Sequence, residues 1–166
     1  MSLIVETGTG SATAESYISV VDADAYFLAR NNAAWAALST ADKEAALRKA
    51  TDYMTATYRS RWQGARVYPS QALDWPRADV IIEDVGVLIT VVPEMVKRAC
   101  AELALKAATA ELNPDLTQGV LQETVGPISV TYDKASPQRT RYAAIDAMLQ
   151  PYLSSGGGVS MKLVRV

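Results

Sequence analysis

Hydrophobic residues recur at helical spacing in two long segments of the chain. Each segment places an apolar residue every three or four positions, which predicts one buried face on each helix. On the first helix, within 38–62, the apolar face consists of Leu47, Ala50, Met54, Thr57 and Tyr58. On the second helix, which we expect to begin at Pro93, it consists of Val96, Ala99, Cys100, Leu103, Ala107 and Ala110. Ser39 followed by Asp42 is close to a capping box, so we expect the first of these helices to begin there.

Two shorter segments show the same period. In residues 19–30, either Ser19 or Asp22 could cap a helix that places Val21, Ala25 and Leu28 along one face. In the second segment, Thr140 can cap a last helix that Pro151 kinks or ends. The apolar positions of that last helix are Tyr142, Ile145, Met148 and Leu149. We therefore expect a mainly α fold, a small bundle of about four helices.

Alternating apolar and polar residues indicate β-structure in two places. The run "QETVGPISVTYD" predicts a two-stranded hairpin near 120–133, with Gly126-Pro127 at its turn. Residues 79–92 contain two further β-like runs around Gly86 and are unusually apolar for a loop. Because a two-stranded ribbon is marginal by itself, we expect the first hairpin to contact a neighbouring surface. The contact residues would be Val125, Ile128, Val130 and Tyr132.

The two ends of the chain show no sustained helical period. We expect an extended N-terminal arm over 1–16, a helical domain over 17–153, and a C-terminal arm over 154–166 that is hinged by three glycines. The C-terminal arm is apolar and cationic, and its length allows it to span up to ~40 Å. We expect it to pair with a partner's exposed sheet edge, and the alternative is a disordered terminus. The contact residues would be Val159, Met161, Lys162, Leu163, Val164, Arg165 and Val166.

The composition limits the chemistry that the chain can perform. The 166 residues include no histidine and one cysteine, and the formal net charge is -2. The absence of histidine removes the commonest general base and the commonest zinc ligand, so we expect no enzyme, no cofactor and no metal. A small enzyme that uses carboxylates is a third and weaker possibility. The lone Cys100 excludes an intramolecular disulfide, and we expect a cytosolic protein without a membrane span or signal peptide.

One stretch combines arginines with large aromatic residues. Residues 58–77 contain four arginines and four large aromatic residues against one acid, Asp74. Single-stranded nucleic acid is bound by this mixture, because aromatic rings stack on bases and guanidinium groups pair with phosphates. Arginine and aromatic residues are also enriched at protein interfaces, and we favour an interface or core role here. The alternative is a DNA-contact set consisting of Tyr58, Arg59, Arg61, Trp62 and Arg66.

The order of the motifs resembles a family of tailed-bacteriophage proteins. Residues 14–153 carry "AYF", "LDWPR", "VPEMVKRACAELALKAA" and "VGPISV", which are similar to segments of head–tail connectors (adaptors) of the lambdoid siphophage type. Some members of that family carry the label "DnaT-like single-stranded DNA-binding protein".

The resemblance implies a structural virion protein without catalytic activity. Such subunits form a ring, typically of twelve copies, on the portal, extend the DNA channel and provide the docking surface for the stopper or tail. The implied partners are further copies of the chain, the portal protein, a stopper or tail-completion protein and the packaged double-stranded DNA, with no membrane. The implied location is the neck of the virion, after assembly in the host cytoplasm.

Overall fold

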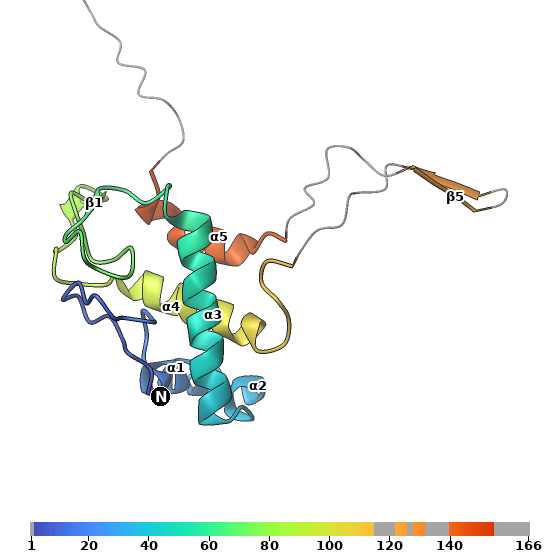
Figure 1. The fold of residues 1–166 in the computed structure, drawn as a ribbon, viewed down its shortest axis with the longest axis horizontal. Coiled ribbons are helices and arrows are strands. Elements are labelled where there is room, and N and C mark those ends of the chain that lie inside the picture. The colour runs from blue at the N-terminus through green and yellow to red at the C-terminus, as the bar shows by residue number, and fades with distance from the viewer. Residues whose placement is uncertain (1, 115–121, 126–127, 132–139, 155–166) are drawn as a thin grey trace, which may run out of the picture.

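Helices form most of the regular structure. The computed structural model describes residues 2–114, 122–125, 128–131 and 140–154. The helices are α1 (Val20–Leu28), α2 (Ala33–Ala36), α3 (Thr40–Tyr58), α4 (Glu94–Ala107), α5 (Ala143–Leu149) and the 3₁₀ turn η1 (Gln150–Tyr152). The expectation of a mainly α protein is therefore confirmed, as Figure 1 shows.

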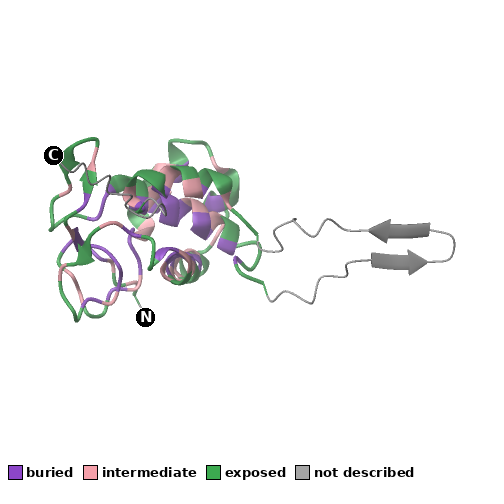
Figure 2. Ribbon diagram, turned by 90° about the horizontal axis from the view of Figure 1, so that it is seen from above, coloured by how far each residue is buried: buried purple, intermediate pink, exposed green. Residues whose placement is uncertain are grey.

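The core lies between α3 and α4. These two helices pack against each other, α5 packs on α4, and α1 contacts both long helices. The buried face of α3 includes Leu47, Ala50, Met54 and Tyr58, as its spacing predicts. The buried face of α4 includes Val96, Cys100 and Leu103, whereas Ala110 lies beyond the helix and is exposed. Figure 2 shows the buried residues concentrated where the helices meet.

Polar side chains mark the beginnings of three helices. The Asp42 N–H donates to Ser39 Oγ on α3, and the Asp22 N–H donates to Ser19 Oγ on α1. Both caps agree with the sequence. The short helix α2 was not expected, and Asn32 caps it by accepting from the Trp35 N–H. The expected cap at Thr140 is wrong, because Tyr142 precedes α5 and no side chain caps that helix.

The direction in which α1 faces differs from the expectation. Val21 and Leu28 are 76% and 82% exposed, and Ala25 is also exposed. The buried residues of α1 are instead Ala23 and Phe27. The Phe27 ring lies 4.8 Å from the Trp35 ring, so the larger aromatic contact decides which face of this short helix turns inward.

Three antiparallel two-stranded hairpins complete the described structure. The strand pairs are β1 (Ala65–Arg66) with β2 (Arg77–Ala78), β3 (Ile81–Ile82) with β4 (Val85–Gly86), and β5 (Gln122–Val125) with β6 (Ile128–Thr131). The expected hairpin near 120–133 is therefore confirmed. Tyr132 lies outside the described residues, and the contact roles of Val125, Ile128 and Val130 stay a prediction.

The N-terminal residues are folded onto the domain, so the expectation of an extended arm there is wrong. The buried Glu6 carboxylate accepts hydrogen bonds from the backbone N–H groups of Gly8, Gly10 and Ser11, at 2.8, 3.0 and 2.7 Å. Successive N–H groups that converge in this way form a nest for an anion. The glycine-containing loop is therefore ordered around an acid of the chain itself. Farther along, Glu15 pairs with Arg48 of α3 at 3.0 Å.

The described C-terminal residues are also fixed. The Ser154 N–H donates to the Arg61 carbonyl at 2.6 Å, next to a bridge between Leu153 and Trp62. The seven arm residues from Val159 to Val166 that were expected to make contacts lie outside the described residues, so their role stays a prediction. Over the described part of the chain, no helix is both long enough and apolar enough to cross a membrane.

Candidate functional site

The C-terminal end of α3 brings an aromatic cluster into the core. Tyr58 and Trp62 are four residues apart, so both point to the same side, and they are only 1% and 4% exposed. Their rings are 5.8 Å apart, and the Trp62 ring meets Trp75 edge-on at 5.7 Å. Trp75 in turn contacts Tyr152 of η1. The peptide bond between Trp75 and Pro76 in "LDWPR" is cis.

Tyr58 also carries a buried polar link. Its hydroxyl donates to Asp146 Oδ1 of α5 at 2.8 Å. Burial, reinforced by this hydrogen bond to a carboxylate, raises the pKa of Tyr58. Tyr58 and Trp62 are therefore structural residues. Neither ring is available to stack on a base, which corrects their place in the expected DNA-contact set.

Arg77 is a structural residue as well. Its guanidinium donates to the carbonyls of Gln63, Gly64 and Asp74, and the residue is 7% exposed. Burial lowers its pKa, and the nearby Asp74 opposes that shift. These three charge-assisted hydrogen bonds from Arg77 stabilise the turn that follows α3. Of the four arginines in 58–77, this one cannot reach a ligand.

The other three arginines of the stretch lie on the surface. Arg59 has a side chain that is 54% exposed, and its Nε donates to Asp74 Oδ1 at 2.9 Å. Arg61 is exposed, with its guanidinium carbon 5.5 Å from the centre of the Tyr58 ring. Arg66 is exposed and donates to the Gln71 carbonyl at 3.1 Å. Arg59 and Arg61 therefore lie at the C-terminal end of α3, and Arg66 lies on β1, which follows that helix in the chain.

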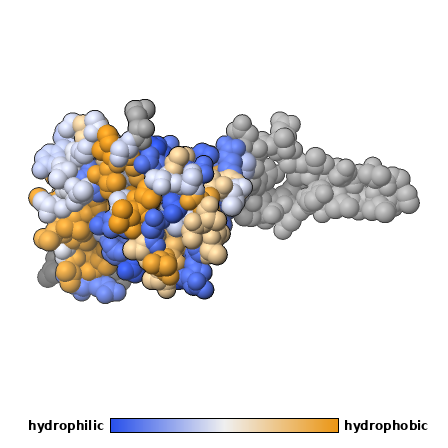
Figure 3. Space-filling model, turned by 90° about the horizontal axis from the view of Figure 1, so that it is seen from below, coloured by the Kyte–Doolittle hydropathy of each residue, from blue (hydrophilic) through white to orange (hydrophobic). Residues whose placement is uncertain are grey.

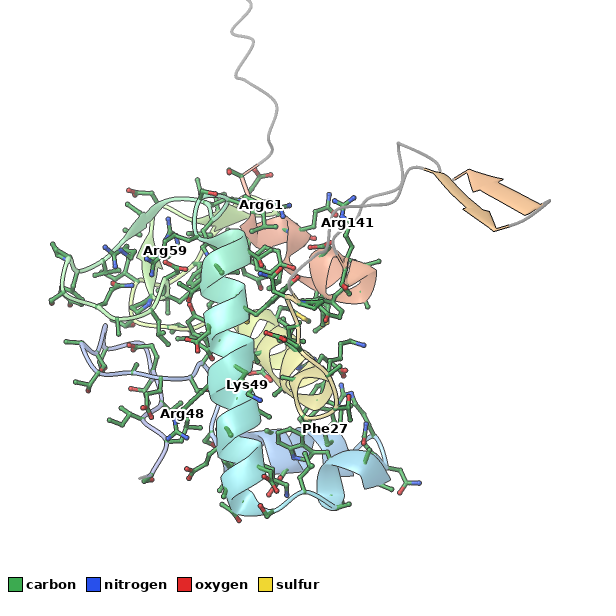
Figure 4. The ribbon with its side chains drawn as sticks, turned by 45° about the vertical axis from the view of Figure 1, so that its right-hand side comes forward. Phe27, Arg48, Lys49, Arg59, Arg61 and Arg141 are labelled. Atoms are coloured by element: carbon green, nitrogen blue, oxygen red, sulfur yellow. The ribbon has the colours of Figure 1, made fainter. Side chains whose placement is uncertain are left out.

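A fourth arginine, Arg141, joins them from a distant part of the chain. It is exposed, and together with Arg61 it lines a cavity of about 440 Å³ that also includes Gln150, Ser154 and Asp146. Figure 4 shows Arg59, Arg61 and Arg141 around the C-terminal end of α3, while Lys49 lies farther down that helix. Arg59, Arg61, Arg66 and Arg141 are called the arginine surface below.

The arginine surface carries an excess of positive charge. Among the described residues, no carboxylate forms an ion pair with Arg61, Arg66 or Arg141, and Arg59 alone is paired, with Asp74. The Asp146 carboxylate lies in the cavity but already accepts from Tyr58. Guanidinium groups without a carboxylate partner can bind phosphate oxygens in a bidentate manner. The surface therefore suits a polyanion, although the whole chain has a net charge of -2.

One aromatic residue remains accessible next to this surface. Tyr68 is 47% exposed and follows β1, two residues after Arg66; its ring covers Gly10. It is the only aromatic residue of the described chain that is exposed rather than buried or half-buried. Tyr68 is therefore the ring that could stack on a base. The sequence placed it in the Arg-rich stretch but could not separate it from the buried rings.

Sequence reasoning did not select Arg141. It lies about 80 positions from Arg61 along the chain, and only the contact of 150–154 with the turn after α3 brings the two together. The two arginines in "QRTRY", directly before the last helix, were the sequence feature that could have indicated a further basic contact. In the described part of the chain, no group of three or more histidine, cysteine, aspartate or glutamate side chains could hold a metal ion.

Comparison with known proteins identifies a family. The family model described as "Putative DnaT-like ssDNA binding protein" matches residues 1–166. No curated protein matches the chain, and no solved structure matches it either.

The family match overturns the head–tail connector as the identity of this chain. The expected ring on a portal, the portal, stopper and packaged-DNA partners, and the channel-building role all rested on that resemblance, and nothing in the comparisons supports them. The virion location stays a prediction that neither the structure nor the comparisons test. The match agrees with the alternative that the Arg-rich stretch raised.

Proposed function

The chain belongs to the DnaT-like family of ssDNA-binding proteins, and we propose that it binds single-stranded DNA through the arginine surface. The observation that carries the proposal is that Arg61 and Arg141 line one cavity without a carboxylate partner among the described residues. Phosphate contacts supply most of the affinity of sequence-independent binding, because each one releases a condensed counterion. The proposed function is binding, with no catalytic step.

The mode of binding differs from the one that the sequence indicates. Tyr58 and Trp62 are in the core, so their part is to hold the arginines in place. Base stacking falls instead to Tyr68, which is exposed and follows Arg66 by two residues in the chain. One stacked base is worth about 1–3 kcal/mol, so phosphate pairing by four arginines dominates the expected affinity.

Fluorescence anisotropy tests the proposal. The affinity of the protein for a labelled oligo-dT of about 20 nucleotides is measured over a range of salt concentrations. The double variant Arg61→Glu/Arg141→Glu should bind at least about tenfold more weakly at low salt. The slope of log K against log[salt] should become shallower by about 1.4, because each phosphate contact on a single strand contributes about 0.7.

The matched control is Arg30→Glu/Lys49→Glu, which makes the same change of net charge on two exposed residues, one in the turn after α1 and one on α3. Those residues lie away from the end of α3, so the control should lose little affinity. An equal loss of affinity in both double variants would mean that only the net charge of the protein determines binding. The arginine surface would then be rejected as the DNA-binding site. Tighter binding to a duplex of the same sequence than to the single strand would reject single-stranded DNA as the ligand.

A further inference from the structure

The second hairpin of the fold exposes an apolar surface that DNA binding does not use. Residues 81–91 hold five exposed large hydrophobic side chains. These are Ile81, Val85, Leu88, Ile89 and Val91, with exposures of 60%, 68%, 70%, 51% and 40%. We call them the β3–β4 apolar surface. Figure 3 shows orange side chains on the left-hand part of the face in view, where Figure 1 places both the N-terminal residues and the loops that follow α3.

Such a surface indicates a binding site. Monomeric soluble proteins rarely leave a contiguous cluster of large apolar side chains in water, because burying apolar area is favourable by about 25 cal/mol per Å². The strands β3 and β4 are two residues long and, among the described strands, are paired only with each other. Gln63 already accepts from the Ile81 N–H of β3, so β4 has the open outer edge. An extended segment is the occupant that uses both features.

The charges around the surface define the chemistry of that segment. Glu83 and Asp84 form the turn between β3 and β4, both with positive φ, and Asp79 lies two residues before β3. All three are exposed, and no cation among the described residues forms an ion pair with any of them. An isologous pairing of two copies would bring these acids together, which is unfavourable. The occupant should therefore be apolar and basic.

The last residues of the chain have this chemistry. In "VSMKLVRV", residues 159–166, the apolar Val159, Met161 and Leu163 alternate with polar or smaller positions, and the two charged residues are Lys162 and Arg165. The segment contains no acid. Its apolar positions and its positive charge therefore complement the surface and the three carboxylates.

The fold delivers this segment next to the hairpin. Ser154, the last described residue, is bound to the Arg61 carbonyl, and η1 contacts β3. The Gln63 side chain links the two elements, because it donates to the Pro151 carbonyl at 2.8 Å and accepts from the Ile81 N–H at 3.4 Å. Only residues 155–158 separate Ser154 from Val159, and four residues reach up to ~13 Å.

We propose that residues 159–166 bind the β3–β4 apolar surface of the same chain. The short tether raises the effective concentration of the segment to the millimolar range, which favours it over the same segment of a second copy. Apolar contact stabilises the complex, and Lys162 and Arg165 pair with the acids of the turn.

Disulfide cross-linking in the full-length chain tests the proposal. The variant Val85→Cys/Leu163→Cys should form an intramolecular disulfide in a glutathione buffer, located by peptide mapping. Cys100 does not interfere, because it is fully buried and burial raises the pKa of its thiol. The matched control is Leu28→Cys/Leu163→Cys, which uses an equally exposed apolar residue on α1 and should give at least about fivefold less cross-link.

Charge reversal supplies the second readout. Glu83→Lys/Asp84→Lys should lower the yield of the 85–163 cross-link by about threefold or more, and adding Lys162→Glu/Arg165→Glu should restore it. Restoration in monomeric protein supports the proposal. A cross-link that appears only between two chains would assign the surface to the segment of a second copy and overturn it. A yield equal to that of the control, or a charge reversal without effect, would overturn it as well.

Discussion

The Tyr58 hydroxyl donates a hydrogen bond to Asp146 Oδ1 at 2.8 Å, which ties the last turn of α3 to α5. The two residues are 88 positions apart in the chain. This bond lies directly beneath the cavity that Arg61 and Arg141 line, since Asp146 also belongs to that cavity. The core and the arginine surface are therefore supported by the same contact.

Removing that bond should weaken the fold. Tyr58→Phe keeps the ring and deletes the donor, so the free energy of unfolding should fall by about 1–2 kcal/mol in urea denaturation. Tyr68→Phe is the control, because Tyr68 is exposed and its hydroxyl forms no hydrogen bond with the described residues. Its free energy of unfolding should therefore stay close to that of the wild type. Unchanged stability of Tyr58→Phe would show that the bond does not form in solution.

Substitutions in the Arg-rich stretch should separate stability from DNA binding. Trp62→Ala removes a buried ring and should lower the free energy of unfolding by about 3–5 kcal/mol. Arg61→Ala should change it by less than about 1 kcal/mol, since the residue is exposed and makes one cation–π contact. DNA affinity at low salt should fall in Arg61→Ala while its thermal unfolding stays normal. A folded Arg61→Ala with wild-type affinity would contradict the role given to this residue.

The loop around Glu6 should depend on Gly8. Gly8 has φ of +105°, and a Cβ there would lie 1.9 Å from the Thr90 carbonyl oxygen. Gly8→Ala should therefore lower the free energy of unfolding by about 2–4 kcal/mol. Gly86→Ala is the matched control, because nothing lies within 4 Å of its Cβ, and it should stay within about 1 kcal/mol of the wild type. Similar effects of the two substitutions would contradict the packing of 2–16 onto the domain.

The contact between Glu15 and Arg48 should make stability depend on pH. The hydrogen bond from Arg48 holds the pKa of Glu15 below its ordinary value of 4.5. The folded pKa is depressed, so this contribution is present above the unfolded value and is lost as pH falls through the folded one. Glu15→Gln should thus be less stable than the wild type near neutral pH, and the difference should shrink below about pH 4.

Urea denaturation across that pH range checks this prediction. Glu111→Gln is the control, since Glu111 is exposed shortly after the end of α4, and its difference from the wild type should not vary with pH. A Glu15→Gln difference that stays constant down to about pH 3 would show that the carboxylate does not pair with Arg48.

Local patterns account for the helices and hairpins that sequence reasoning found. The spacing of Leu47, Ala50 and Met54 identifies the buried face of α3, because side chains three and four apart share a face. Ser19 and Ser39 mark helix starts because their hydroxyls accept from backbone N–H groups two or three residues on. Such rules act within a few residues and so are visible in the sequence. The same rules gave the wrong face of α1, where contact of Phe27 with Trp35 decides the orientation.

The sequence identified only part of the candidate DNA-binding site. The stretch 58–77 identifies the right region, since it brings arginines and aromatic residues together. It cannot say that Trp62 and Arg77 are buried while Arg61 and Tyr68 are exposed, because that depends on packing against α5 and η1. The resemblance to head–tail connectors led to a wrong prediction of function. Shared segments such as "LDWPR" build the aromatic core and carry no information about a partner.

The sequence by itself determined the long helices, their caps, the hairpin near 120–133 and the region of the DNA-binding site. Each of these depends on residues that are neighbours along the chain. Only the tertiary structure decided that Glu6 accepts from the N–H groups of Gly8, Gly10 and Ser11, and that Arg141 joins Arg61 at one cavity. Both depend on which surfaces meet when the chain folds, and hydrophobic burial selects that arrangement from contacts between distant residues.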